Sequence, residues 1–319
     1  MAVLSPSRPT APPSSKGSPE TVRRTLLRRR RFKDNLAGYA FLAPQLIGLL
    51  VFMIGPLIFA VVLSLSRWDG FGKLTFVGLS NFGEIFSDPQ LMRSVVNTVW
   101  FTVLQVPGLM LSALCVAVML QRSGKLKSFY RVFYFAPVVT STVAVAAIWL
   151  WLFNPEISPI NGFLAELGLP APDWLQDSRF VIASFAIVGI WQGLGYQVVI
   201  FMAGLENIPR TVLEAAEIDG ASEWQKLWKI TLPLLSPTIL FLSITSVIGS
   251  FQVFDYIYVF MDTAAPAAAR TVVYEIVRLA FSEFKFGLAS AVASCLFMAL
   301  LCLTGLQLAA QKRWVHYTE

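Results

Sequence analysis

The sequence has little of what enzymes use for chemistry. Its 319 residues include a single histidine, His316, and three cysteines, so no histidine-based catalytic triad and no cluster of metal ligands can be assembled. The phosphate-binding pattern GxxxxGK[ST] is absent as well. We therefore expect a protein without a catalytic or metal site of its own. Because the cysteines lie in apolar stretches, they indicate no disulfide framework.

Charge is also scarce. Charged residues make up 14% of the chain, hydrophobic residues make up 56%, and the mean hydropathy is +0.65, which is typical of polytopic membrane proteins. A helix needs about 20 apolar residues to cross the hydrocarbon core. Six stretches without Asp, Glu, Lys or Arg are long enough: 35–66, 94–121, 132–155, 180–205, 230–254 and 286–311. The sequence predicts an all-α fold with six transmembrane helices.

Lys and Arg are distributed unevenly between the two sides of this arrangement. The side that holds both termini and the second and fourth loops carries 18 of the 25 basic residues, and the other side carries 7. By the positive-inside rule, both termini and the loop 205–237 are cytoplasmic. We therefore attribute the net charge of +6 to the orientation of the chain in the membrane and to contacts with lipid headgroups. No nucleic-acid partner is expected.

We divide the chain into three parts. Residues 1–35 are rich in Ser, Pro and Ala and then in Arg, which predicts a disordered, basic cytoplasmic tail that touches anionic lipid. Residues 36–311 form the transmembrane domain. Pro44 and Pro56 predict kinks in the first span or a short interfacial piece before the true crossing, and Pro107 predicts a bend in the second span. Residues 312–319 are a cytoplasmic tail.

The loop between the fourth and fifth spans is the most polar internal segment. It reads EAAEIDGASEWQKLWKITLP from Glu214 to Pro233. Helix formers from Thr211 to Asp219 follow Pro209, Gly220 interrupts them, and a second helical run follows. We predict a helix, a tight glycine turn and a second helix that ends at Pro233, a shape suited to docking on another protein.

This loop resembles the EAA loop of the membrane subunits of binding-protein-dependent ABC importers, in the carbohydrate-uptake branch that includes maltose and glycerol-phosphate permeases. The residues that carry the resemblance are Glu214, Ala215, Ala216, Asp219, Gly220, Ile230, Leu232 and Pro233. The segment 76–82 is similar to the FxGLxNF segment of the same family, and the likeness extends over residues 38–311.

The resemblance implies a permease subunit in the cytoplasmic membrane whose loop docks into a groove of an ATPase subunit. It also implies a second permease, two ATPase subunits and an extracytoplasmic binding protein as partners. ATP and magnesium would then bind to the ATPase, and this chain would need no cofactor.

The fourth and fifth spans hold the candidate substrate pathway. Sugars require neutral hydrogen-bonding groups and aromatic faces, which these two spans provide. The candidate residues are Trp191, Gln192, Gly193, Tyr196, Gln252, Asp255 and Tyr256. Asp255 is compatible with two locations, within the pathway or at the outer membrane interface.

An ion-coupled carrier or a channel is the alternative function. Such a carrier needs several ionisable groups at membrane depth, whereas Asp255 is the one candidate here. The solute stays open among disaccharides, oligosaccharides and glycerol-phosphate derivatives, although the candidate residues include no Arg or Lys cluster for a phosphate.

Overall fold

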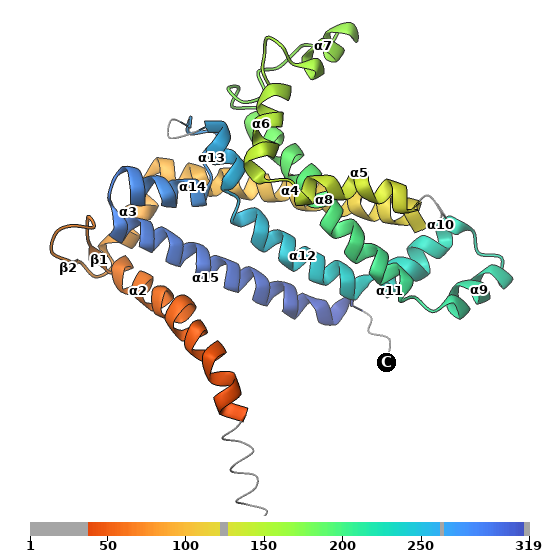
Figure 1. Ribbon diagram of the computed structural model, residues 1–319, viewed down its shortest axis with the longest axis horizontal. Helices are drawn as coiled ribbons and strands as arrows, with labels where there is room; N and C mark the ends of the chain where they lie inside the picture. The colour runs from red at the N-terminus through yellow and green to blue at the C-terminus, as the bar shows by residue number, and fades with distance from the viewer. Residues whose placement is uncertain (1–37, 122–126, 262–264, 316–319) are drawn as a thin grey trace, which may run out of the picture. The chain divides into compact units, whose positions relative to one another are not determined.

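The computed structural model describes residues 38–121, 127–261 and 265–315 (Figure 1). The predicted tail 1–35 and the end of the C-terminal tail, 316–319, lie outside the described residues. The chain divides into two units, Met1–Phe59 and Ala60–Glu319, which are treated separately below.

The first unit contributes one apolar helical segment that continues into the second. This candidate span covers Gly38–Ser64 and includes the π-helix η1 (Leu50–Ile54) and the α-helix α2 (Gly55–Ser64). The segment is regular α-helix around Pro44, but its turn widens just before Pro56, where the N–H of Gly55 donates to the carbonyl of Leu50. Proline lacks an N–H and crowds the carbonyl four residues earlier, which a wider turn relieves.

Among the described residues of the second unit, four more helices are long and apolar enough to cross a membrane, or five spans if one sharply bent helix pair counts as a span. The helices of this apolar framework are α4 (Pro89–Gln121), α5 (Lys127–Val139), α6 (Thr142–Leu152), α8 (Val181–Glu206), α12 (Ser236–Phe251), α13 (Asp255–Met261) and α15 (Phe286–Ala310). Helix α4 continues through Pro107. The all-α membrane fold predicted from the sequence is confirmed.

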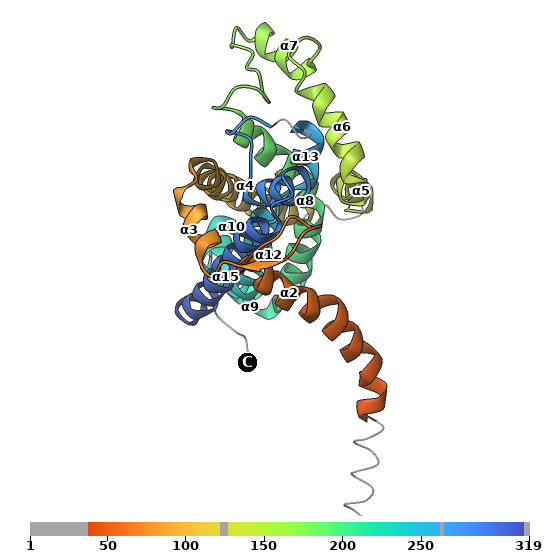
Figure 2. The same ribbon diagram turned by 90° about the vertical axis from the view of Figure 1, so that its left-hand side faces the viewer.

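The third predicted span differs from a simple transmembrane helix. The helical segments 132–139 and 142–152 meet at an angle of 111°, and α6 turns away from α5 and leads to α7 (Figures 1 and 2). The helix breaks at Ser141, whose ψ of 135° is extended, directly after Thr140 donates its hydroxyl back to the carbonyl of Ala136. Hydroxyl side chains compete with the helical hydrogen-bond pattern, which favours a break in this Thr-Ser-Thr run.

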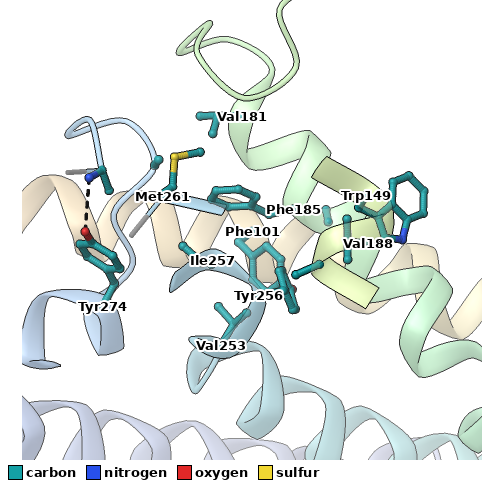
Figure 3. Close-up of a cluster of buried hydrophobic side chains, with 14 of the residues drawn as sticks. Phe101, Trp149, Val181, Phe185, Val188, Val253, Tyr256, Ile257, Met261 and Tyr274 are labelled. Atoms are coloured by element: carbon teal, nitrogen blue, oxygen red, sulfur yellow. Dashed lines mark hydrogen bonds between the residues drawn. The ribbon is translucent and has the colours of Figure 1, made fainter. Parts of the chain in front are cut away.

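Helices α4 and α8 form the centre of the unit. Near the N-terminal half of α8, a cluster of buried side chains includes Phe101 of α4, Phe185 of α8 and Ile257 of α13 (Figure 3). Toward the C-terminal end of α8, a second cluster joins α4, α8 and α12 through small and large apolar residues such as Ala113 and Phe201. Helices α5 and α8 also pack closely at Gly195, where an added Cβ would collide with the carbonyl oxygen of Tyr134.

Short elements cover the ends of the long helices. They are the antiparallel strands β1 (Ser66–Arg67) and β2 (Thr75–Phe76), the helices α3 (Ser80–Ser87), α7 (Pro159–Glu166) and α14 (Val272–Val277), the π-helix η4 (Arg278–Ser282) and the 3-10 turn η5 (Gln311–Arg313). The amide of Asn81 donates to the carbonyls of Ser64 and Ser66, at 2.8 and 2.9 Å. This buried asparagine therefore fixes the chain where it leaves the first span.

A buried carboxylate organises the segment before α15. Glu275 is fully buried and accepts from Arg270 at 3.3 Å and from Arg278 at 2.7 Å. The amide of Asn97 on α4 donates to the carbonyls of Ala267 and Arg270, both at 2.9 Å. These contacts attach the segment 265–278 to the N-terminal end of α4, which the predicted topology places on the outer side of the membrane.

Candidate coupling loop and transport pathway

The charged loop forms the predicted helix, glycine turn and second helix. Helix α9 spans Arg210–Ile218, with Pro209 as its N-cap. Gly220 has a φ of +77°, and the amides of Gly220 and Ala221 donate to the carbonyls of Glu217 and Ala216, at 3.0 and 2.9 Å. These are the bonds of a left-handed helix terminus, which favours glycine because it has no Cβ.

The second half of the loop starts as predicted but does not end at Pro233. Ser222 accepts from the amide of Gln225, and the side chain of Gln225 accepts from the amide of Ser222, which forms a capping box at the start of α10 (Glu223–Lys226). The chain then continues through the π-helix η3 (Leu227–Thr231) and α11 (Leu232–Leu234) into α12. Pro233 lies in the first turn of α11, where a proline costs no intrahelical hydrogen bond, so the helical path continues past it.

A buried lysine joins the two helices of the loop. Nζ of Lys226 lies 2.7 Å from a carboxylate oxygen of Glu217 on α9 and also pairs with Glu223. The hydrogen bonds to Glu217 and then Glu223 raise the pKa of Lys226 above its usual value. The ammonium group is therefore charged at physiological pH, and the two pairs connect α9 to α10 across the Gly220 turn. Lys226 also lines a cavity of about 540 Å³ between this loop and the C-terminal end of α4.

The residues that carry the EAA resemblance separate into two groups. Glu214, Ala215, Asp219 and Gly220 are exposed, while Ala216 packs inward. Ile230, Leu232 and Pro233 are half-buried along η3 and α11. The largest exposed fractions among the large apolar side chains of the loop are those of Ile218 (87%), Trp224 (67%) and Trp228 (55%). The loop thus presents an apolar and acidic surface on a shape held by hydrogen bonds.

The candidate pathway residues gather around one pocket of about 440 Å³. Helices α4, α8 and α12, the bent α5–α6 pair and the start of α13 contribute to its wall. The lining residues are Phe101, Gln105, Val138, Thr142, Gly189, Gln192, Gly193, Tyr196, Gly249, Gln252, Val253, Phe254, Asp255 and Tyr256. Six of the seven candidates are among them. The exception is Trp191, whose ring packs edge-on against Trp149 with centroids 5.8 Å apart.

The pocket has a mixed lining of apolar and polar side chains, with Asp255 as the one charged residue among the lining residues that the structure describes. Tyr196, Gln252 and Asp255 are exposed, and Gln192 donates to the hydroxyl of Thr142 at 3.3 Å. Helix α12 ends at Phe251 and α13 begins at Asp255, so the break between them places Gln252 and Asp255 at the pocket. Asp255 therefore lies at the wall of this pocket, and its place within the pathway stays a prediction.

Two polar lining residues were absent from the predicted set. Gln105 comes from α4, and Thr142 begins α6. An amide in the middle of an apolar span, two residues before Pro107, is a signal that could have identified Gln105. Its proximity to α8 and α13, however, depends on helix packing that the sequence does not reveal.

The comparisons with known proteins agree with this geometry. Residues 108–316 match the family described as "Binding-protein-dependent transport system inner membrane component". The chain is 34% identical over 290 residues to the probable ABC transporter permease protein YesP of Bacillus subtilis, covering 89% of this chain and 93% of YesP. It is 32% identical over 289 residues to the sn-glycerol-3-phosphate transport system permease protein UgpA of Brucella abortus, covering 90% and 98%.

A shorter match and a solved structure extend the comparison. The lactose transport system permease protein LacF of Rhizobium radiobacter is 35% identical over 242 residues, which cover 75% of this chain and 80% of LacF. A chain of a bacterial alginate ABC transporter, solved with an alginate pentasaccharide-bound periplasmic protein, superposes with a TM-score of 0.79 at 22% identity, covering 89% of this chain and 96% of that one. This superposition shows that the alginate transporter chain and the present chain share a fold. This multi-pass membrane protein, a non-catalytic transporter subunit, belongs to the family of inner membrane components of binding-protein-dependent transport systems.

Proposed function

We propose that this chain is the permease subunit of an ATP-driven importer for a sugar or sugar-like solute. With a second permease subunit it forms the pathway for a solute that an extracytoplasmic binding protein delivers. Two ATPase subunits bind ATP and magnesium, and the loop of α9 and α10 docks onto one of them. Both termini and this loop face the cytoplasm.

The connection between the loop and the pocket is the observation that carries the proposal. Helix α8 lines the pocket with Gly189, Gln192, Gly193 and Tyr196 and ends at Glu206, four residues before α9 begins. On the other side, α10 continues through η3 and α11 into α12, whose C-terminal end lines the same pocket. A displacement of the loop by the ATPase therefore acts on two walls of the pocket through helices.

The named solutes of similar proteins support the substrate class. UgpA is named for sn-glycerol 3-phosphate and LacF for lactose, and the structural neighbour belongs to a transporter of alginate. All three are polyhydroxylated, and the amide and phenol groups of the pocket are suited to hydroxyl groups.

Co-purification in detergent followed by transport assays tests the proposal. An ATPase and a second permease should remain bound in stoichiometric amounts, and proteoliposomes with the binding protein should take up solute only when ATP is supplied. A self-sufficient oligomer that transports without ATP would instead establish the ion-coupled carrier or channel.

A further inference from the structure

A second groove, of about 390 Å³, lies between the N-terminal parts of α4 and α8 and shares no described lining residue with the central pocket. Arg93, Val96, Trp100 and Leu104 of α4 line it at intervals of three or four residues, so they lie along one face of that helix. Residues between 178 and 183, where α8 begins, supply the opposite wall. The groove therefore runs from the end of both helices toward their middle.

Two arginines stand at the end of this groove. Arg93 is the last charged residue before the charge-free stretch 94–121, and Arg179 is the last one before the charge-free stretch 180–205. The fold brings both to one site, and the described lining residues include no carboxylate. Arg93 is exposed and has no ion pair within the part of the chain that the structure describes. The mouth of the groove is therefore positively charged.

A neighbouring carboxylate orients the second arginine. Nε and Nη2 of Arg179 donate to the carboxylate of Asp177, at 3.2 and 2.8 Å. Nη1 of Arg179 has no partner among the described residues, so its two N–H groups are available to another acceptor. Asp177 balances one of the two positive charges, and the mouth keeps the other. A guanidinium group held in this way is suited to bind a phosphate.

The rest of the groove is apolar and open to the outside of the chain. Val96, Trp100 and Leu104 are 48%, 58% and 41% exposed. Leu104 follows Arg93 by eleven residues, which is about 16 Å along a helix and roughly half of the hydrocarbon core. Trp100 lies between them, at the depth where tryptophan is enriched near the membrane surface. A water-soluble partner cannot reach along this face, whereas an acyl chain lies at this depth.

We propose that this groove binds one anionic phospholipid. Its phosphate pairs with Arg93 and with Nη1 of Arg179, and an acyl chain lies against Val96, Trp100 and Leu104. The lipid belongs to the outer leaflet in the predicted topology, because the N-terminal ends of α4 and α8 are on the outer side. It would join the outer ends of these two helices. The inference does not depend on the importer function.

Lipid titration followed by native mass spectrometry tests the inference on the complete transporter in detergent. The probes are dioleoylphosphatidylglycerol, which is anionic, and dioleoylphosphatidylcholine, which is zwitterionic. The wild type should bind one phosphatidylglycerol more tightly than phosphatidylcholine. Arg93→Gln and Arg179→Gln should each weaken phosphatidylglycerol binding about fivefold, the effect of one arginine at an anionic headgroup, and the double variant should bind it more weakly still.

Arg67→Gln is the matched control, because it makes the same substitution at another exposed arginine that borders a charge-free span. Arg67 lines a different pocket, in which Asp69, Glu84 and Glu283 make an anionic ligand unfavourable. This variant should bind phosphatidylglycerol like the wild type. Without added lipid, all variants should keep the melting temperature of the wild type.

Three results would overturn the inference. Equal phosphatidylglycerol affinity in the double variant and the wild type is one, and it is also the result expected if the second permease covers the groove. An equal loss in Arg67→Gln would show attraction to the charged surface in general. Displacement of the lipid by an equal concentration of sn-glycerol 3-phosphate would show a site for a free phosphate anion. Because binding is measured without solute or ATP, each of these results leaves the proposed importer function unaffected.

Discussion

Gln252 and Tyr196 show how single residues are placed at the pocket. Gln252 caps the C-terminal end of α12, and Tyr196 is 52% exposed one turn beyond Gln192 on α8. We expect Gln252→Ala and Tyr196→Ala each to lower kcat/KM for uptake about two- to tenfold, because each loses hydrogen-bonding groups that face the solute. Initial uptake rates in proteoliposomes measure the effect, and retention of the ATPase measures assembly.

Gln176→Ala, an exposed glutamine outside the pocket, is the control and should leave uptake unchanged. If Gln252→Ala and Tyr196→Ala both kept wild-type kinetics, the pathway would lie elsewhere.

The helical period explains which pocket residues the sequence could predict. Gly189, Gln192, Gly193 and Tyr196 are spaced by three or four residues, so they share one face of α8, whereas Trp191 points to another face. Three of the predicted residues, Gln192, Gly193 and Tyr196, lie on this face, whereas Gln252, Asp255 and Tyr256 come from the end of α12 and from α13. Gln105 could not be assigned in this way, because its place in the pocket depends on the packing of α4 against α8 and α13.

At the level of elements, the turn at Gly220 carries a specific prediction. Its φ of +77° is unfavourable for a residue with a Cβ, at about 1–2 kcal/mol, but among the described residues no atom beyond Gly220 and its two chain neighbours lies within 4 Å of the position that a Cβ would take. We expect Gly220→Val to remain inserted and folded with a small loss of stability. If the loop docks onto the ATPase as we propose, the exposed turn must fit that subunit, and the variant should lose ATPase subunits on purification and lose ATP-driven uptake.

Gly168→Val is the matched control for this effect. Gly168 also has a positive φ, +70°, and an open Cβ position, but it lies in the connection between α7 and α8, at the opposite end of α8 from the coupling loop. It should show the same small loss of stability and retain the ATPase. Wild-type coupling in Gly220→Val would refute the role of the loop in transmitting force.

The Lys226 contacts lead to a second prediction for the loop. Lys226→Met keeps the length of the side chain but removes the charge that joins α9 to α10. We expect faster amide hydrogen exchange across residues 215–226 and less solute imported per ATP hydrolysed. Lys229→Met replaces an exposed lysine in the same loop and serves as the control. Identical exchange rates in the two variants would show that Lys226 does not stabilise the loop.

Elements were predicted best where a local pattern determines them. The Gly220 turn follows from glycine chemistry, and its position was correct to the residue. The 111° bend in the third predicted span was missed, because apolar composition is the same in a straight and a broken helix. The continuation of the helical path past Pro233 was missed for a related reason. A proline disrupts the interior of a helix but is tolerated in its first turn.

At the scale of the whole molecule, helix α8 is long enough to connect the two sides of the membrane. Its 26 residues span about 39 Å at 1.5 Å per residue, more than the roughly 30 Å of the hydrocarbon core. The coupling loop follows its C-terminal end, and the connection from α7 precedes its N-terminal end. The uneven distribution of Lys and Arg predicts that these two ends lie on opposite sides, with the loop in the cytoplasm.

Single introduced cysteines test this orientation. Ser178→Cys and Thr211→Cys replace exposed residues just before and just after α8 with side chains of similar size. A membrane-impermeant maleimide should label Ser178→Cys when it is added from outside, and Thr211→Cys only after permeabilisation. The chain with its native Cys115, Cys295 and Cys302 is the background control, and it should stay unlabelled because these thiols lie in α4 and α15 within the predicted bilayer. Labelling of Thr211→Cys from outside would place the loop away from ATP, and no ATPase could then act on it.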